Sequence, residues 1–175
     1  NNILIKSLNE INEESNFILL HVDEKWSSTN WSIHDLDNLI NKIIKSLNVK
    51  IIISEGASGN LYSDYIFKKY LFRKNNNKDF NISISSIEEM KNVAIFKDLD
   101  IEKLILLSFN ASLVITNHGS LTHFSSFNDV PVIDLISKGK KEYLKKYYPK
   151  STVYEQVILE SVEDLLTLIK KLYKS

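Results

Sequence analysis

Residues 113–136, "LVITNHGSLTHFSSFNDVPVIDLI", decide the fold that we expect for this chain. An apolar run at 113–116 predicts a buried strand, and a second run at 131–136 predicts the next one. Between them, the residues at 120–129 predict a short helix. A strand, a tight turn, a helix and another strand in this order are typical of a parallel sheet that is covered by helices.

The same alternation continues on both sides of this stretch. Apolar runs predict further strands at 16–22, 50–54, 80–85 and 92–97, and the run at 80–85 suits an edge strand. Helical spacing predicts helices at 32–48, 63–74, 100–111 and 162–174, with N-caps at Ser32, Asp100 and Ser161. The expected fold class is therefore α/β: residues 1–175 form a single Rossmann-like domain of three layers with a parallel sheet.

Composition and charge exclude several classes of function. The chain has 175 residues, which suits one domain, and its formal net charge of zero gives no electrostatic argument for a nucleic acid. It has no cysteine, and its four histidines show no zinc-binding pattern, so we expect no metal. No apolar run reaches the length of a transmembrane span and no signal peptide is visible, so the expected location is the cytoplasm.

The turn at 117–123 is the first candidate site. A helix N-terminus offers unpaired N–H groups and a partial positive charge, which suit a phosphate or diphosphate. Gly119 lacks a Cβ, which lets a ligand approach the backbone, and Ser120 and Thr122 add hydroxyl groups. His123 can donate a hydrogen bond or carry a charge. The residues alone fit an ordinary turn equally well, with Ser120 as a simple N-cap.

A second polar loop, HVDEKWSSTNWS (21–32), follows the end of the first predicted strand. Because ligands of parallel sheets bind at the carboxyl ends of the strands, this loop is expected at the same edge as the turn at 117–123. Lys25 can pair with a phosphate there. We expect Trp31 to pack in the core at the start of the following helix.

These segments resemble the donor-site region of the heptosyltransferase-like glycosyltransferases, glycosyltransferase family 9. In that family an apolar strand is followed by N-D-S-G-P-M-H, a helix of small residues and G-x-P-V-x-x-L, and ASLVITNHGSLTHFSSFNDVPVIDLI (111–136) resembles this pattern. The segments at 21–43 and 96–117 are similar to the family's corresponding segments, in the same order. The resemblance covers roughly residues 16–136.

The resemblance implies one half of a GT-B fold, in which two Rossmann-like domains face each other across a cleft. The C-terminal domain binds a nucleoside diphosphate sugar, without a metal or another cofactor. Residues 1–15 would then be an interdomain linker helix, and the N-terminal Rossmann-like domain with the catalytic base would be missing. The isolated chain is expected to bind nucleotide weakly and to transfer nothing.

The implied function is the transfer of a heptose-like sugar or another hexose to a glycan or lipid-linked acceptor of the lipopolysaccharide type. This implies a location in the cytoplasm, including the periphery of the inner membrane. Two alternatives stay open. One is a catalytically degenerate GT-B-like module for protein–protein contact, and the other is a standalone flavodoxin-like binder of a nucleotide or phosphate.

The family pattern assigns roles to individual residues. His123 matches the family's His and is the expected catalytic residue, which would stabilise charge on the leaving group. His118 stands where the family has Asp, and Thr29 stands where it has a phosphate-binding Lys, with Lys25 as the nearest substitute. The implied donor-binding residues are Lys25, Ser28, Thr29, Asn117, His118, Gly119, Ser120, Leu121 and Thr122.

Overall fold

The computed structural model describes residues 16–56, 61–70, 72–75, 81–85, 91–140, 146, 149, 153–158 and 160–173. The expected linker helix at 1–15 lies outside these residues. The strands of the sheet are β1 (Phe17–Val22), β2 (Lys50–Glu55), β3 (Phe72–Asn75), β4 (Asn81–Ser85), β5 (Val93–Lys97), β6 (Leu113–Asn117), β7 (Val132–Ile136) and β8 (Tyr154–Ile158). The helices are the short 3-10 helix η1 (Glu24–Ser28), α2 (Ile33–Leu47), α3 (Leu61–Lys69), α4 (Ile101–Phe109), α5 (Ser120–Phe127) and α7 (Val162–Tyr173).

The described strands form one eight-stranded sheet in the order β3-β4-β5-β2-β1-β6-β7-β8. From β5 to β8 all neighbours are parallel, whereas β4 is antiparallel to both β5 and β3. If only the six parallel strands are numbered along the chain, their order is that of a Rossmann fold, 3-2-1-4-5-6. The predicted fold class is confirmed. The direction of winding reverses between β1 and β6, which is where sheets of this kind bind ligands.

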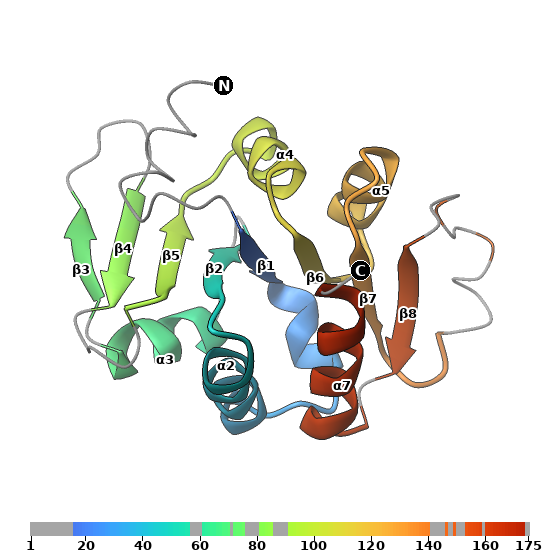
Figure 1. Ribbon diagram of the computed structural model, residues 1–175, viewed down its shortest axis with the longest axis horizontal. Helices are drawn as coiled ribbons and strands as arrows, with labels where there is room; N and C mark the ends of the chain where they lie inside the picture. Colours follow the sequence, from blue (N-terminus) through green and yellow to red (C-terminus); the bar gives the residue numbers. More distant parts are fainter. Residues whose placement is uncertain are drawn as a thin grey trace.

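The sheet separates two hydrophobic cores. Along β1 the side chains alternate, so that Ile18 and Leu20 face one core while Phe17 and Leu19 face the other. Helices α2, α3 and α7 cover the first face, and α4 and α5 cover the second (Figure 1). Because both faces are covered, the central strands are apolar along nearly their whole length, and β1 is buried throughout.

The N-caps expected from the sequence are confirmed. The Ser32 hydroxyl accepts the N–H of Asp35 at 3.2 Å, and Asp35 Oδ2 accepts the N–H of Ser32 at 2.8 Å, which together form a capping box on α2. Asp100 accepts the N–H of Lys103 at 2.8 Å. Ser161 Oγ accepts the N–H of Asp164 at 3.1 Å. These caps fix where the helices begin at the ends of the loops.

Replacing Ser32 with alanine is expected to lower the free energy of unfolding by about 1 kcal/mol, because the first turn of α2 loses its side-chain acceptor. Chemical denaturation at neutral pH measures this change. Ser32→Asp keeps an acceptor and should stay within about 0.5 kcal/mol of the native protein. An equal loss in both variants would show that the cap does not stabilise the fold.

The structure corrects the prediction at both ends of the sheet. The helix predicted over 63–74 ends at Lys69, and Phe72–Asn75 forms β3 instead, so β4 is not the edge strand. The four residues FRKN at 72–75 carry no pattern that separates a strand from the end of a helix, and antiparallel pairing with β4 decides between them. Strand β8 was not predicted. Polar residues interrupt its apolar pattern, and parallel pairing with β7 determines its conformation.

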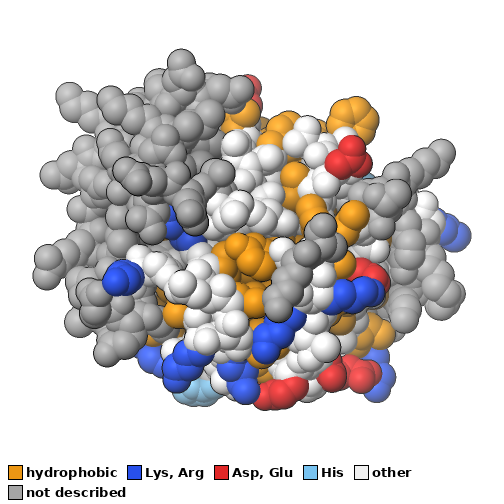
Figure 2. Space-filling view, in the orientation of Figure 1, with side chains coloured by type: hydrophobic (Ala, Val, Ile, Leu, Met, Phe, Trp, Pro, Cys, Tyr) orange, Lys and Arg blue, Asp and Glu red, His pale blue; other side chains and the backbone are white. Residues whose placement is uncertain are grey.

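The outer surface over α2 and α7 carries charges of both signs, as the lower part of Figure 2 shows. Lys42 Nζ on α2 pairs with Glu163 on α7 at 2.8 Å, which links the two neighbouring helices. Among the described residues, no helix combines the length and the apolar character that a membrane crossing requires.

Candidate functional site

The two candidate loops, which lie far apart in sequence, meet at the switch point of the sheet. Lys25 on η1 follows β1, and its Nζ donates a hydrogen bond to the carbonyl oxygen of His118, which follows β6, at 3.1 Å. Lys25 Nζ also lies 3.6 Å from Asp23 Oδ2. A Cβ added to Gly119 would lie 3.0 Å from Lys25 Nζ. The ammonium group therefore lies against the backbone that leads into α5.

The position of Lys25 is set by a well-ordered turn. Asp23 Oδ1 accepts the N–H of Lys25 at 3.0 Å and caps η1, and burial raises the pKa of the Asp23 carboxyl. Trp26 is fully buried, and its Nε1 donates to the carbonyl oxygen of His21 at 2.9 Å. Trp31 packs edge-on against Trp26 with a centroid distance of 6.2 Å, which confirms the expectation that Trp31 lies in the core.

His21, near the end of β1, links this strand to β2 through its side chain. Its Nδ1 lies 3.0 Å from the hydroxyl of Ser54 at the corresponding position of β2. Burial, together with the nearby charge of Lys25, lowers the pKa of His21 to about 4. The imidazole is therefore neutral at physiological pH and adds no positive charge to the site.

Thr29 and Ser28 occupy the end of η1. The hydroxyl of Thr29 is buried and donates to the carbonyl oxygen of Trp26 at 2.7 Å, while its oxygen accepts the N–H of Trp31 at 3.3 Å. Ser28 is the last residue of η1. Thr29, which stands at the position of the family's phosphate-binding Lys, is thus engaged in holding the loop, and Lys25 is the cation of this turn.

The turn before α5 differs in detail from the expectation. Gly119 is the N-cap, with an extended backbone (φ 178°) that any residue can adopt, so its lack of a Cβ matters for the space beside Lys25. Ser120 is exposed and begins the helix, whereas Leu121 is buried in the core. Thr122 is fully buried, and its Oγ1 accepts the N–H of Gly119 at 3.3 Å. The sequence suggested that the hydroxyl of Thr122 is available to a ligand, but in the structure this hydroxyl is buried and bonded to Gly119.

The two histidines of the turn lie side by side. His118 and His123 pack edge to face with ring centroids 5.4 Å apart. His118 precedes α5 and is not part of it, so its ring lies beside that of His123 although five residues separate the two in sequence. His123 is exposed in the first turn of the helix. The pair places two imidazoles next to the N–H groups that begin α5.

His118 is bound to a carboxylate that sequence reasoning missed. Its Nδ1 lies 2.6 Å from Oδ2 of Asp134, which is fully buried in the middle of β7. The same oxygen accepts hydrogen bonds from Gln156 Nε2, at 3.1 Å, and from the hydroxyl of Tyr154, both on β8. The signal was present in PVIDLI, because a carboxylate in a buried apolar strand needs a partner.

A cavity of about 140 Å³ opens at this edge, between the ends of β6 and β7. Its lining includes Lys25 from the first loop, Asn117 and His118 from the second, and Lys140 after β7. The side-chain oxygen of Asn117 is buried and has no hydrogen-bond partner within the described residues. Two lysines and an imidazole around a small cavity suit an anion of the size of a phosphate group.

Neither a comparison with protein-family models nor one with curated protein sequences finds a match. Comparison with solved structures does. E. coli ADP-heptose LPS heptosyltransferase II is similar with a TM-score of 0.70 and 11% identity, over 99% of this chain and 51% of that one.

Two further structures were solved with nucleotide ligands. UDP-GlcNAc 2-epimerase of Methanocaldococcus jannaschii, in complex with UDP-GlcNAc and UDP, has a TM-score of 0.65 and 16% identity, over 100% of this chain and 42% of that one. E. coli heptosyltransferase WaaC with ADP-2-deoxy-2-fluoro heptose has a TM-score of 0.62 and 11% identity, over 89% of this chain and 42% of that one. The fold is thus that of a domain of GT-B proteins, and the chain spans about half or less of these relatives.

Proposed function

We propose that this chain is the nucleotide-sugar-binding domain of a glycosyltransferase with two facing Rossmann-like domains. The observation that carries the proposal is the contact of Lys25 Nζ with the backbone at His118, at the switch point of the sheet. It brings a cation, two imidazoles and a helix N-terminus to one edge. This combination suits a diphosphate, whose two negative charges need several donors.

The donor diphosphate would lie across the start of α5. Lys25 would bind one phosphate through its ammonium group, and Ser120 would add its exposed hydroxyl. Leu121 and Thr122 would contribute backbone N–H groups, since their side chains are buried. His123, exposed in the first turn, would stabilise the negative charge that develops on the departing nucleotide. Asn117 and His118 would line the cavity beside it.

This assignment concerns donor binding, and the rest of the reaction would need a second domain. The catalytic base and the acceptor site would come from a preceding Rossmann-like domain. A glycan or lipid-linked acceptor is therefore part of the proposal for the whole protein. No metal is proposed, because the lysine and imidazole side chains would supply the positive charge.

A second candidate is epimerisation of the sugar while it is attached to its nucleotide. The similarity to UDP-GlcNAc 2-epimerases supports it, because those enzymes match this chain over its full length. Both functions use a nucleoside diphosphate sugar, so both fit the same site. Product analysis of the full-length protein separates them, since transfer requires an acceptor and epimerisation does not.

Isothermal titration calorimetry with UDP, ADP, GDP and their sugar derivatives tests the proposed function. We expect at least one of these ligands to bind with a dissociation constant of about 1 mM or below. Lys25→Ala should weaken the binding at least about tenfold, because a charge-assisted contact with phosphate is worth about 1.5–3 kcal/mol in favourable geometry, and about 1.4 kcal/mol is tenfold in affinity.

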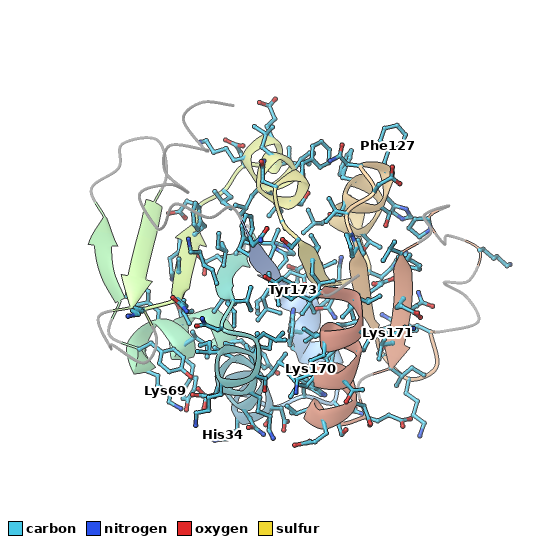
Figure 3. All side chains as sticks on the ribbon, viewed as in Figure 1. His34, Lys69, Phe127, Lys170, Lys171 and Tyr173 are labelled. Atoms are coloured by element: carbon cyan, nitrogen blue, oxygen red, sulfur yellow. The ribbon has the colours of Figure 1, made fainter. Side chains whose placement is uncertain are left out.

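Lys171→Ala is the matched control. It removes the same charge from the far end of α7 (Figure 3), where Lys171 pairs with Glu155 at the amino end of β8. Its affinity should equal that of the native chain. If the native chain bound none of these ligands at millimolar concentration, or if both lysine variants lost affinity equally, the proposed donor site would be wrong.

A further inference from the structure

The buried carboxylate of Asp134 has no role in the donor site described so far. Its side chain has no solvent exposure, and Oδ2 accepts hydrogen bonds from Tyr154 and Gln156 and lies 2.6 Å from Nδ1 of His118. The other oxygen, Oδ1, has no hydrogen-bond partner in the described part of the chain. Burying a carboxylate costs several kcal/mol of desolvation unless a partner compensates it. The partner that reaches the binding edge is His118.

The contact with Asp134 determines how His118 faces the cavity. Because Oδ2 already accepts hydrogen bonds from Tyr154 and Gln156, the geometry favours the tautomer of His118 in which Nδ1 carries the proton and donates to this oxygen. The other ring nitrogen, Nε2, lies on the far side of the ring and forms no hydrogen bond with the described residues. The side chain is 16% exposed, and His118 is one of the residues that line the cavity, together with Lys25. Nε2 is therefore the atom available to a ligand.

Charged and titratable groups of several elements lie near His118. Lys25 on η1 contacts its carbonyl oxygen and pairs with Asp23, His123 on α5 packs against its ring, and Lys140 after β7 lines the same cavity. Asp134 on β7 binds Nδ1, and Tyr154 on β8 binds the same carboxylate. The cavity side therefore carries positive charge, and the buried side carries negative charge. A bound diphosphate would place negative charge next to Nε2 and favour a second proton there. Asp134 would then stabilise the resulting imidazolium from behind.

We infer that Asp134 is a positioning residue, which holds His118 so that it takes up a proton at Nε2 when the diphosphate of the donor binds. The protonated Nε2 donates a hydrogen bond to a diphosphate oxygen, and no covalent bond forms or breaks. Gln156 and Tyr154 keep the carboxylate in the orientation that faces Nδ1. The inference rests on the proposed function, because it concerns how the same site recognises its ligand.

The pH dependence of affinity tests the proton uptake. UDP-GlcNAc and ADP-glucose are suitable probes, because their diphosphates are diesters that do not titrate between about pH 6 and pH 8.5. We expect the affinity of the native chain for the better probe to fall about tenfold over this range. His118→Gln should bind equally weakly at all pH values, and Asp134→Asn should lose most of the slope as well.

His34→Gln is the matched control, since it removes an imidazole on α2 that does not line the cavity, and it should keep both the affinity and the slope. The inference is overturned if His118→Gln keeps the full pH dependence, or if His34→Gln alone abolishes it. A native chain that binds the probe with the same affinity at all pH values also overturns it, while the proposed function survives. If neither probe binds at any pH, the proposed function is wrong, and the inference, which rests on it, is wrong with it.

NMR of the imidazole nitrogens tests the role of Asp134 without a nucleotide. In the free native chain at pH 8, we expect the ¹⁵N chemical shift of His118 Nδ1 to be that of a protonated nitrogen and the shift of Nε2 to be that of an unprotonated nitrogen. Inorganic pyrophosphate should move Nε2 to the protonated position. Asp134→Asn should reverse or mix the tautomers. If this variant does not fold, Tyr154→Phe should weaken the preference in the same direction. If Nδ1 of His118 has the chemical shift of an unprotonated nitrogen in the native chain, the inference is overturned.

Discussion

Replacing Trp26 with alanine is expected to lower the free energy of unfolding by about 4 kcal/mol and to abolish the nucleotide binding that we propose. The side chain is fully buried between Trp31 and Tyr62, and deleting a large aromatic residue from a core leaves a cavity that the surroundings cannot fill. It also removes the donor to the His21 carbonyl oxygen. Because Lys25 is the preceding residue, the cation of the site loses its support. Chemical denaturation and titration calorimetry measure the two effects.

Trp26→Phe is the control for this prediction. It keeps most of the apolar volume but leaves the buried carbonyl oxygen of His21 without its side-chain donor. The cost should be about 1–3 kcal/mol, which is the usual penalty for an unsatisfied buried polar group. A Trp26→Ala variant of nearly native stability would mean that η1 is not anchored through this side chain.

Acid should destabilise the protein through His21, by roughly 3 kcal/mol between neutral pH and pH 4. The pKa of His21 is lowered from 6.5 to about 4 in the folded chain, so the unfolded chain binds this proton more readily. Stability is therefore fully present above about pH 6.5, falls as the pH decreases, and loses nothing more from this group below about pH 4. Urea denaturation at a series of pH values measures the loss.

His21→Asn isolates this contribution, because the amide does not titrate but can still reach the Ser54 hydroxyl. Other groups should respond to acid in the same way in both proteins. The native chain should then lose roughly 3 kcal/mol more than the variant over this range. Parallel pH profiles for the two proteins would show that His21 does not titrate as its burial requires.

Local patterns in the sequence were sufficient for the fold class and for the edge of the sheet at which the two candidate loops meet. An uninterrupted apolar run such as the one at 113–116 is typical of a central strand covered on both faces, and β6 confirms this prediction. Ser32 and Asp100 were readable as N-caps because capping depends on residues three positions apart. The meeting of the two loops followed from a general rule, namely that parallel strands end at the same edge.

What each site residue does at that edge was decided by contacts between distant segments. Lys25 reaches the backbone at His118, which lies 93 residues later, and Asp134 reaches His118 from a neighbouring strand. Such pairings leave no trace in local spacing, because they depend on the register between β6, β7 and β8. For Thr122 the local pattern was misleading: the sequence suggested a hydroxyl available to a ligand, but the side chain is buried in the first turn of α5.

The sequence by itself therefore determined a parallel α/β sheet, its N-caps and the edge at which the two candidate loops meet, because these depend on periodicity, on short-range hydrogen bonds and on the common direction of parallel strands. Only the tertiary structure decided the edge strands β3 and β8, the contact of Lys25 with the turn, and the partner of His118. The physical reason is that an edge strand and a buried carboxylate are both stabilised by groups far away in the chain. Their own residues suit more than one environment until those groups are in place.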